Sequence, residues 1–175
     1  MSSSLFFALR PDAPAAVRAM DISARLRVDH GLKTPATAVE RLHVTLHHLG
    51  ALREETVARA LRAAATLDCP AFEVRFDMAT SLKSGAKKRP LVLLNREALQ
   101  PLQDFRSTLG VALSLHGVDV DTGSFTPHLT LLRDARAVPE QSVGPVAWKA
   151  REFVLLQSLV GQGQYVVLGR WPLNG

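Results

Sequence analysis

The spacing of polar and apolar residues predicts a series of short strands. Residues 42–49 and 72–79 alternate with a period of two, and 4–9, 90–94 and 125–132 have the length and apolar content of strands. The segments 153–159 and 165–171 flank Gly161 and Gly163, which is typical of a hairpin. We also expect 72–79 to pair with 90–94 across the loop that joins them.

Three segments between these strands have the character of helices. Residues 14–28 carry apolar side chains near helical spacing and end at His30 and Gly31. Residues 54–67 are rich in Ala and Arg, and 98–109 form the third segment. Helices and strands are interspersed without a linker or a low-complexity stretch. The chain of 175 residues, 47% of them hydrophobic, therefore predicts a single domain over 1–175.

The net charge of +5 is compatible with an anionic partner such as a nucleic acid. Most arginines are scattered along the predicted helices, where they would solvate exposed faces. The exception is a cluster around Ser84 and Gly85, which we call the basic loop: Lys83, Lys87, Lys88 and Arg89.

No apolar run approaches the ~20 residues needed to span a membrane, and the start of the chain lacks the basic residues of a secretion signal. We therefore expect a cytoplasmic protein that does not enter a membrane. Cys69 is the single cysteine, so neither an internal disulfide nor a CxxC metal or redox motif is available, and a small core residue is the expected role.

One tetrapeptide pattern occurs twice and marks an internal repeat. His43-Val44-Thr45-Leu46 recurs as His128-Leu129-Thr130-Leu131, each copy in a predicted strand. Because residues i and i+2 of a strand face the same side, each copy presents an imidazole beside a hydroxyl. The repeat predicts two pseudo-symmetric halves whose four polar side chains line one cleft.

Paired histidines of this kind suit the hydrolysis of a phosphodiester. One ring can deprotonate water while the other protonates the departing oxygen, because an imidazole pKa of ~6.5 permits either state near neutral pH. Thr45 and Thr130 can donate hydrogen bonds to phosphate oxygens. Arg133, five residues after His128, is placed to neutralise phosphate charge through a bidentate contact.

Two further histidines follow the first motif. Strict alternation would put His47 on the face of His43 and Thr45, where an ordinary position at the rim is expected rather than a role in chemistry. The same alternation would direct His48 to the opposite face.

Over nearly its whole length the sequence resembles the two-histidine phosphoesterase superfamily, and within it the RNA 2′,3′-cyclic phosphodiesterases described as bacterial RNA 2′-5′ ligases. The resemblance lies in LFFALRPD, RLHVTLHHLG, KRPLVLL, FTPHLTLLR and the closing FVLLQSLVGQGQYVVLGRWPL. It departs from the family at His48, where relatives often carry an aromatic residue, commonly Phe.

This resemblance implies a bilobal, pseudo-symmetric α+β fold with two antiparallel sheets, outer helices and one motif from each lobe at a central cleft. It implies opening of RNA or nucleoside 2′,3′-cyclic phosphates to 2′-phosphates without a metal ion. We expect the protein to be a monomer that needs no other cofactor. His43 would protonate the leaving 3′-oxygen and His128 would activate water. Thr45, Thr130 and Arg133 would bind the phosphate.

Several alternatives remain open on sequence alone. The same site could hydrolyse another small cyclic phosphate or join RNA ends by the reverse reaction, since an enzyme accelerates both directions. A metal site built on His43, His47 and His128 is disfavoured because neither motif contains Asp or Glu. An RNA-binding module without activity would fit the charge, but it would leave the histidine repeat unexplained.

Overall fold

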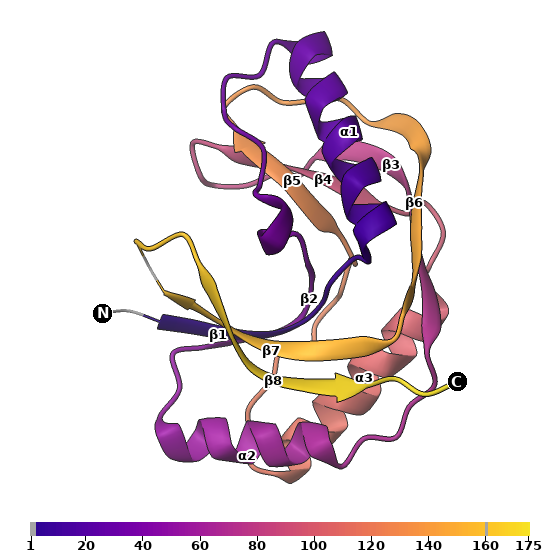
Figure 1. Cartoon of the computed structure of the whole chain (residues 1–175). Helices are drawn as coiled ribbons and strands as arrows, with labels where there is room; N and C mark the ends of the chain where they lie inside the picture. The colour runs from indigo at the N-terminus through magenta and orange to yellow at the C-terminus, as the bar shows by residue number, and fades with distance from the viewer. Residues whose placement is uncertain (1–2, 160) are drawn as a thin grey trace.

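The computed structural model describes residues 3–159 and 161–175, which form eight strands, three α-helices and one short 3₁₀ helix (Figure 1). The strands are β1 Ser3–Leu9, β2 Val44–Gly50, β3 Phe72–Ser81, β4 Arg89–Leu94, β5 Leu129–Asp134, β6 Gln141–Ala150, β7 Glu152–Leu159 and β8 Tyr165–Pro172. The helices are α1 Ala13–His30, η1 Val39–Arg41, α2 Glu54–Ala65 and α3 Gln100–Leu115.

The first lobe is an antiparallel sheet in the order β2-β1-β7-β8. The two faces of this sheet pack in different places. In β1, Leu5, Phe7 and Leu9 belong to the main core, whereas Phe6 and Ala8 face away from it. Helices α2 and α3 pack against each other on the core side, with α2 against β8 and α3 against β2 (Figure 1). Among the described residues, no α-helix covers the opposite face of this sheet (Figure 1).

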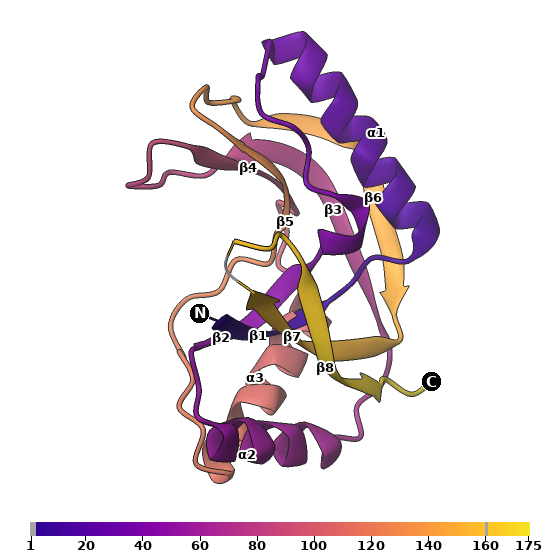
Figure 2. The ribbon, with the colours of Figure 1, turned by 60° about the vertical axis from the view of Figure 1, so that its left-hand side comes forward.

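The second lobe is an antiparallel sheet in the order β5-β4-β3-β6, covered by α1 (Figure 2). Helix α1 begins where the Asp12 carboxylate accepts a hydrogen bond from the backbone N–H of Ala15. It ends at Gly31, whose φ of 60° lies in the left-handed region that glycine adopts without strain. Each lobe thus has one sheet face that no described α-helix covers. The two His-x-Thr-Leu (HxTL) motifs, His43–Leu46 and His128–Leu131, each begin one residue before an edge strand, β2 in the first lobe and β5 in the second.

The architecture confirms the expected α+β fold with two antiparallel sheets, outer helices and one motif in each lobe. The pairing of β3 with β4 is confirmed as well. Two elements differ from the sequence prediction: α3 continues to Leu115, and the segment from Phe125 to His128 precedes β5 instead of forming its first half.

Strand β6 was not predicted, because Gly144 and Pro145 interrupt its sequence. Proline removes a hydrogen-bond donor and is tolerated in strands mainly at sheet edges, which is where β6 lies. Its buried residues still alternate after the irregularity, with Val146, Trp148 and Ala150 in the core. Within the described part of the chain, no helix is long and apolar enough to cross a membrane.

Candidate functional site

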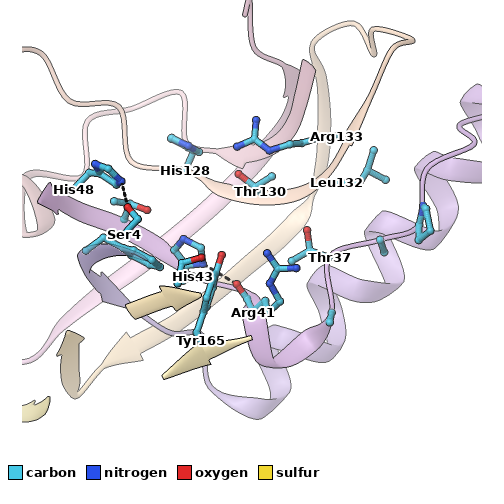
Figure 3. Close-up of a pocket in the computed structure, with 16 residues that line it drawn as sticks. Ser4, Thr37, Arg41, His43, His48, His128, Thr130, Leu132, Arg133 and Tyr165 are labelled. Carbon is cyan, nitrogen blue, oxygen red and sulfur yellow. Dashed lines mark hydrogen bonds between the residues drawn. The ribbon is translucent and has the colours of Figure 1, made fainter. Parts of the chain in front are cut away.

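A cleft of about 570 Å³ lies where the helix-free faces of the two lobes meet (Figure 3). It contains all five residues that the sequence singled out: His43, Thr45, His128, Thr130 and Arg133. The other lining residues are Ser4, Phe6, Pro35, Ala36, Thr37, Ala38, Arg41, His48, Leu132, Ser158 and Tyr165. The structure therefore brings together residues that are far apart in the sequence, as the repeat predicted.

The two motif histidines occupy equivalent positions on opposite walls (Figure 3). Each immediately precedes its strand, and each ring uses Nδ1 to contact the backbone carbonyl two residues earlier. His43 Nδ1 lies 2.7 Å from Arg41 O, and His128 Nδ1 lies 2.8 Å from Thr126 O. Because a carbonyl can only accept, Nδ1 carries the proton and donates in both cases.

This shared contact decides which nitrogen is available for chemistry. With Nδ1–H committed to the backbone, a neutral ring keeps its lone pair on Nε2, and a protonated ring carries its second N–H there. Either histidine can therefore act as a base or as an acid through Nε2 without changing its orientation. A fixed tautomer of this kind is what positioned acid–base catalysis requires.

The surroundings of His43 affect its pKa. Burial of His43 lowers its pKa, and the nearby charges of His128, Arg10 and Arg41 lower it further, while the contact with the Arg41 carbonyl opposes the shift. Phe6 and Tyr165 account for part of that burial, with ring centroids 4.9 Å and 5.4 Å from the His43 ring. The free protein thus favours a neutral His43, and a bound phosphate anion would favour its protonated form.

Both motif strands contain a register shift at the same place. In β2, Thr45 pairs with Ala8 and His47 with Phe7, so Leu46 is left out of the register; in β5, Leu131 is skipped in the same way opposite Leu91 and Val92. An extra residue in a strand re-aims the side chains that follow it. The bulge at the leucine of each HxTL motif is therefore a second pseudo-symmetric feature of the site.

These bulges determine the residues that enter the cleft. Strict alternation from Thr130 would direct Arg133 away from the cleft, but the bulge at Leu131 lets it line the cleft together with Leu132. In β2 the corresponding fifth residue after the motif histidine is His48, which also lines the cleft and contacts Ser4 Oγ through Nε2 at 2.6 Å. The prediction that His48 points to the opposite face was wrong.

The prediction for His47 was wrong for the same reason. The bulge turns His47 to the core side of the sheet, where it is 5% exposed and its Nε2 lies 2.9 Å from the carbonyl oxygen of Arg106 in α3. It does not line the cleft. A metal site made of His43, His47 and His128 is thereby ruled out, since β2 separates His47 from the other two rings.

The charges that line the cleft are all positive. The charged side chains are those of Arg41 and Arg133, and the described lining residues include neither Asp nor Glu. Thr45 and Thr130 add two hydroxyl donors beside the histidines. This combination favours an anion with several acceptor oxygens, such as a phosphate. Within the described part of the chain, no group of three or more His, Cys, Asp or Glu side chains is arranged to hold a metal ion.

Asp134 holds the wall of the cleft next to Arg133. Its carboxylate accepts backbone hydrogen bonds from Arg136 at 2.9 Å, Thr34 at 2.9 Å and Lys33 at 3.0 Å. These N–H donors, that of Arg136 first, keep the pKa of Asp134 well below its ordinary value. The carboxylate thereby attaches Lys33 and Thr34 to the end of β5. The cleft residues 35–38 follow directly.

Arg106 connects the flanks of the two motifs from outside the cleft. Its Nε donates to the carbonyl of the bulged residue Leu46 at 3.0 Å, and its terminal nitrogens donate to the carbonyls of Asp121 at 2.9 Å and Gly123 at 3.4 Å. Its guanidinium also lies 4.4 Å from the ring centroid of Phe125, three residues before His128. One side chain therefore contacts both the strand that follows His43 and the segment that precedes His128.

Comparison with known families agrees with this geometry. The sequence pattern of the 2′-5′ RNA ligase superfamily matches residues 11–160, which include both motifs. The chain belongs to that superfamily, and its two-lobed architecture is that of the two-histidine phosphoesterases. None of the curated proteins compared with the chain by sequence matches it.

Solved structures match most or all of the chain. Escherichia coli LigT complexed with 3′-AMP has 25% sequence identity and a TM-score of 0.81, with 100% of each chain covered. The protein TT0787 of Thermus thermophilus has 22% identity and a TM-score of 0.75 over 98% of each chain. The MHV ns2 PDE domain shares the fold at 16% identity, with a TM-score of 0.58 over 83% of this chain and 97% of that one.

Proposed function

We propose that this protein hydrolyses the 2′,3′-cyclic phosphate ends of RNA, or of nucleosides, to 2′-phosphates without a metal ion. The observation that carries the proposal is the pair of equivalent histidines on opposite walls of one cationic cleft, each with Nδ1 bound to its own backbone and Nε2 free for proton transfer. Both motifs belong to one chain, so the proposal requires only a monomer of a single two-lobed domain, acting in the cytoplasm.

In the proposed mechanism, His128 Nε2 takes a proton from water as the water oxygen attacks phosphorus. The bond between phosphorus and the 3′-oxygen breaks, and His43 Nε2 gives its proton to that oxygen. The products are a 2′-phosphate and a 3′-hydroxyl. Attack and departure occur on opposite sides of phosphorus, which is why a base and an acid on opposite walls suit the reaction.

The remaining polar residues of the cleft stabilise the charge on the phosphate. Thr45 and Thr130 donate hydroxyl hydrogen bonds to its non-bridging oxygens, and Arg133 supplies a planar guanidinium. The bound anion also raises the pKa of His43, which offsets the effect of burial and lets His43 hold the proton that the leaving oxygen needs.

Ligands of the solved relatives support a phosphate-binding cleft. Structures of Escherichia coli LigT have been solved with 3′-AMP, ATP, NADP⁺ and phosphate. All four carry phosphate groups, and NADP⁺ contains a ribose 2′-phosphate like the product proposed for this protein. Joining of RNA ends through a 2′-5′ linkage would use the same groups in the reverse direction.

The decisive experiment is incubation of the purified protein with adenosine 2′,3′-cyclic phosphate in excess EDTA, with the product isomer identified by ³¹P NMR. We expect turnover to adenosine 2′-phosphate. The variant that lacks both motif histidines, purified in parallel, controls for a contaminating nuclease. Loss of turnover in EDTA with recovery on adding a divalent metal would contradict the mechanism. RNA binding without any turnover would indicate a binding module instead.

A further inference from the structure

Arg41 is a cation in the cleft for which the proposed mechanism has no use. It ends η1, and within the described part of the chain its side chain makes neither an ion pair nor a hydrogen bond. Its contact is with Tyr165 of β8, whose ring centroid lies 5.0 Å from the guanidinium carbon. The Nε atom is shielded from solvent, and Figure 3 shows the guanidinium directed into the cleft.

Arg41 and Arg133 lie on opposite sides of the cleft (Figure 3). The guanidinium carbon of Arg41 lies 5.0 Å from the centroid of the Tyr165 ring, which also contacts the His43 ring at 5.4 Å between centroids. In Figure 3 it lies toward Thr37, whereas Ser4 and His48 lie at the other end of the cleft. Arg133 stands on the opposite wall with His128 and Thr130, where the reacting phosphate is expected.

Thr37 adds a hydroxyl to the same end of the cleft. Its backbone N–H donates to the carbonyl of Leu131, the bulged residue of the second motif, at 2.7 Å. That hydrogen bond attaches the segment between α1 and η1 to β5. The Thr37 side chain lines the cleft beside Arg41 (Figure 3). A guanidinium next to a hydroxyl is a donor set that suits a second phosphate.

The charge of the substrate also favours a second phosphate next to Arg41. A cyclic phosphate bears one negative charge, which Arg133 and a protonated histidine already offset. A further arginine without a carboxylate partner attracts a ligand that carries another negative group. In a nucleotide with a 2′,3′-cyclic phosphate, the next phosphate is attached to the 5′-oxygen of the same ribose.

We propose that Arg41 and Thr37 form a second phosphate subsite, which binds the phosphate on the 5′-oxygen of the terminal nucleotide. The proposal rests on the function proposed above. The 5′-phosphate could be the internucleotide link of RNA or the terminal phosphate of a mononucleotide, and both present the same non-bridging oxygens to a guanidinium.

Titration calorimetry with three ligands tests the subsite without requiring turnover. The ligands are adenosine 2′-phosphate, adenosine 2′,5′-bisphosphate and the dinucleotide ApA with a terminal 2′-phosphate. We expect the parent protein to bind the bisphosphate, the dinucleotide or both at least about tenfold more tightly than the monophosphate, as one charge-assisted contact permits. The ligand that shows the gain identifies the source of the 5′-phosphate.

Arg41→Gln should reduce that gain to about twofold or less, and Thr37→Val should reduce it in part. Arg53→Gln, on the exposed residue that caps α2 far from the cleft, should preserve it. Equal affinity of the parent for all three ligands would overturn the proposal. So would an Arg41→Gln variant that loses affinity for all three by the same factor, since Arg41 would then act at the reacting phosphate.

Turnover of the cyclic phosphate in the parallel EDTA assay separates this proposal from the proposed function. If the parent binds the bisphosphate through Arg41 but hydrolyses no cyclic phosphate, the subsite stands and the reaction is wrong. If the parent hydrolyses the cyclic phosphate but gains nothing from a 5′-phosphate, the reaction stands and the subsite is wrong.

Discussion

Replacing Arg106 with methionine tests whether one side chain outside the cleft holds the two catalytic motifs in place. Methionine keeps most of the apolar stem but removes every donor. The part-buried bond to the Leu46 carbonyl is worth about 1.5–2 kcal/mol, as expected of a bond from a charged donor. The more exposed bonds to Asp121 and Gly123 add about 0.5 kcal/mol together, and the contact with Phe125 adds about 0.5–1 kcal/mol.

The sum is a loss of about 3 kcal/mol in the free energy of unfolding. For a chain of 175 residues this corresponds to a fall in Tm of about 6–12 °C. Because the same bonds restrain the strand after His43 and the segment before His128, we also expect kcat at 25 °C to fall by about tenfold or more, since small displacements of catalytic groups are costly.

Differential scanning fluorimetry and steady-state kinetics measure the two effects. Arg62→Met on α2 is the matched control, because Arg62 lies on the helix away from the cleft and makes no hydrogen bond or ion pair with any described residue. It should leave both Tm and kcat close to the parent values. An Arg106→Met variant with Tm within 2 °C of the parent, a margin of less than about 1 kcal/mol, would refute the energetic reasoning. A large fall in Tm with unchanged kcat would refute the link to catalysis.

Three further predictions concern the cleft and its surroundings. Arg133→Ala should lower kcat/KM by about 100-fold. Arg133→Lys should recover only part of the lost kcat/KM, because an ammonium lacks the planar fork of a guanidinium. Equal activity of the Lys variant and the parent would show that charge alone suffices. Replacing Lys87, Lys88 and Arg89 with Gln should raise KM for an oligonucleotide and flatten its salt dependence while sparing a mononucleotide. The reason is that the basic loop projects where β3 and β4 are joined (Figure 2), next to the pairing of Pro90 with Arg133. Equal changes for both substrates would contradict this role. The pH dependence of kcat/KM should be bell-shaped, and its alkaline limb should disappear in His43→Ala. Because a bound anion raises the pKa of His43, the alkaline limb of the parent should lie at higher pH in the kcat profile than in the kcat/KM profile. Loss of the acidic limb in His43→Ala would instead make His43 the base.

The repeated motif made the centre of the site predictable from sequence. A histidine and a threonine two residues apart share one strand face, and the same pair in a second strand implies a shared cleft. The positions of the strands along the chain followed from alternation wherever the alternation was regular. Strand β6 was not predicted because Gly144 and Pro145 break its pattern. The edge position of β6 tolerates the proline, because no neighbouring strand is needed on that side.

The rest of the cleft depends on features that alternation cannot reveal. The bulges at Leu46 and Leu131 reverse the phase of both strands, so His48 enters the cleft and His47 leaves it. The repeat itself contained the missing signal, because His48 follows His43 by the same number of residues as Arg133 follows His128. Arg41 and Tyr165 come from a 3₁₀ helix and a distant hairpin, and tertiary packing alone brings them together.

The proposed reaction requires His43 and His128 to act as one acid–base pair. The most direct test is kcat for His43→Ala, His128→Ala and the double variant, measured on adenosine 2′,3′-cyclic phosphate in EDTA. In each single variant kcat should fall by at least ~100-fold, as expected for removal of a positioned acid or base. In the double variant kcat should fall by much less than the product of the two single factors, because the two groups act in the same step and removing one already removes most of the benefit of the other. A single variant with near-normal kcat, or losses that multiply in full, would contradict the paired mechanism.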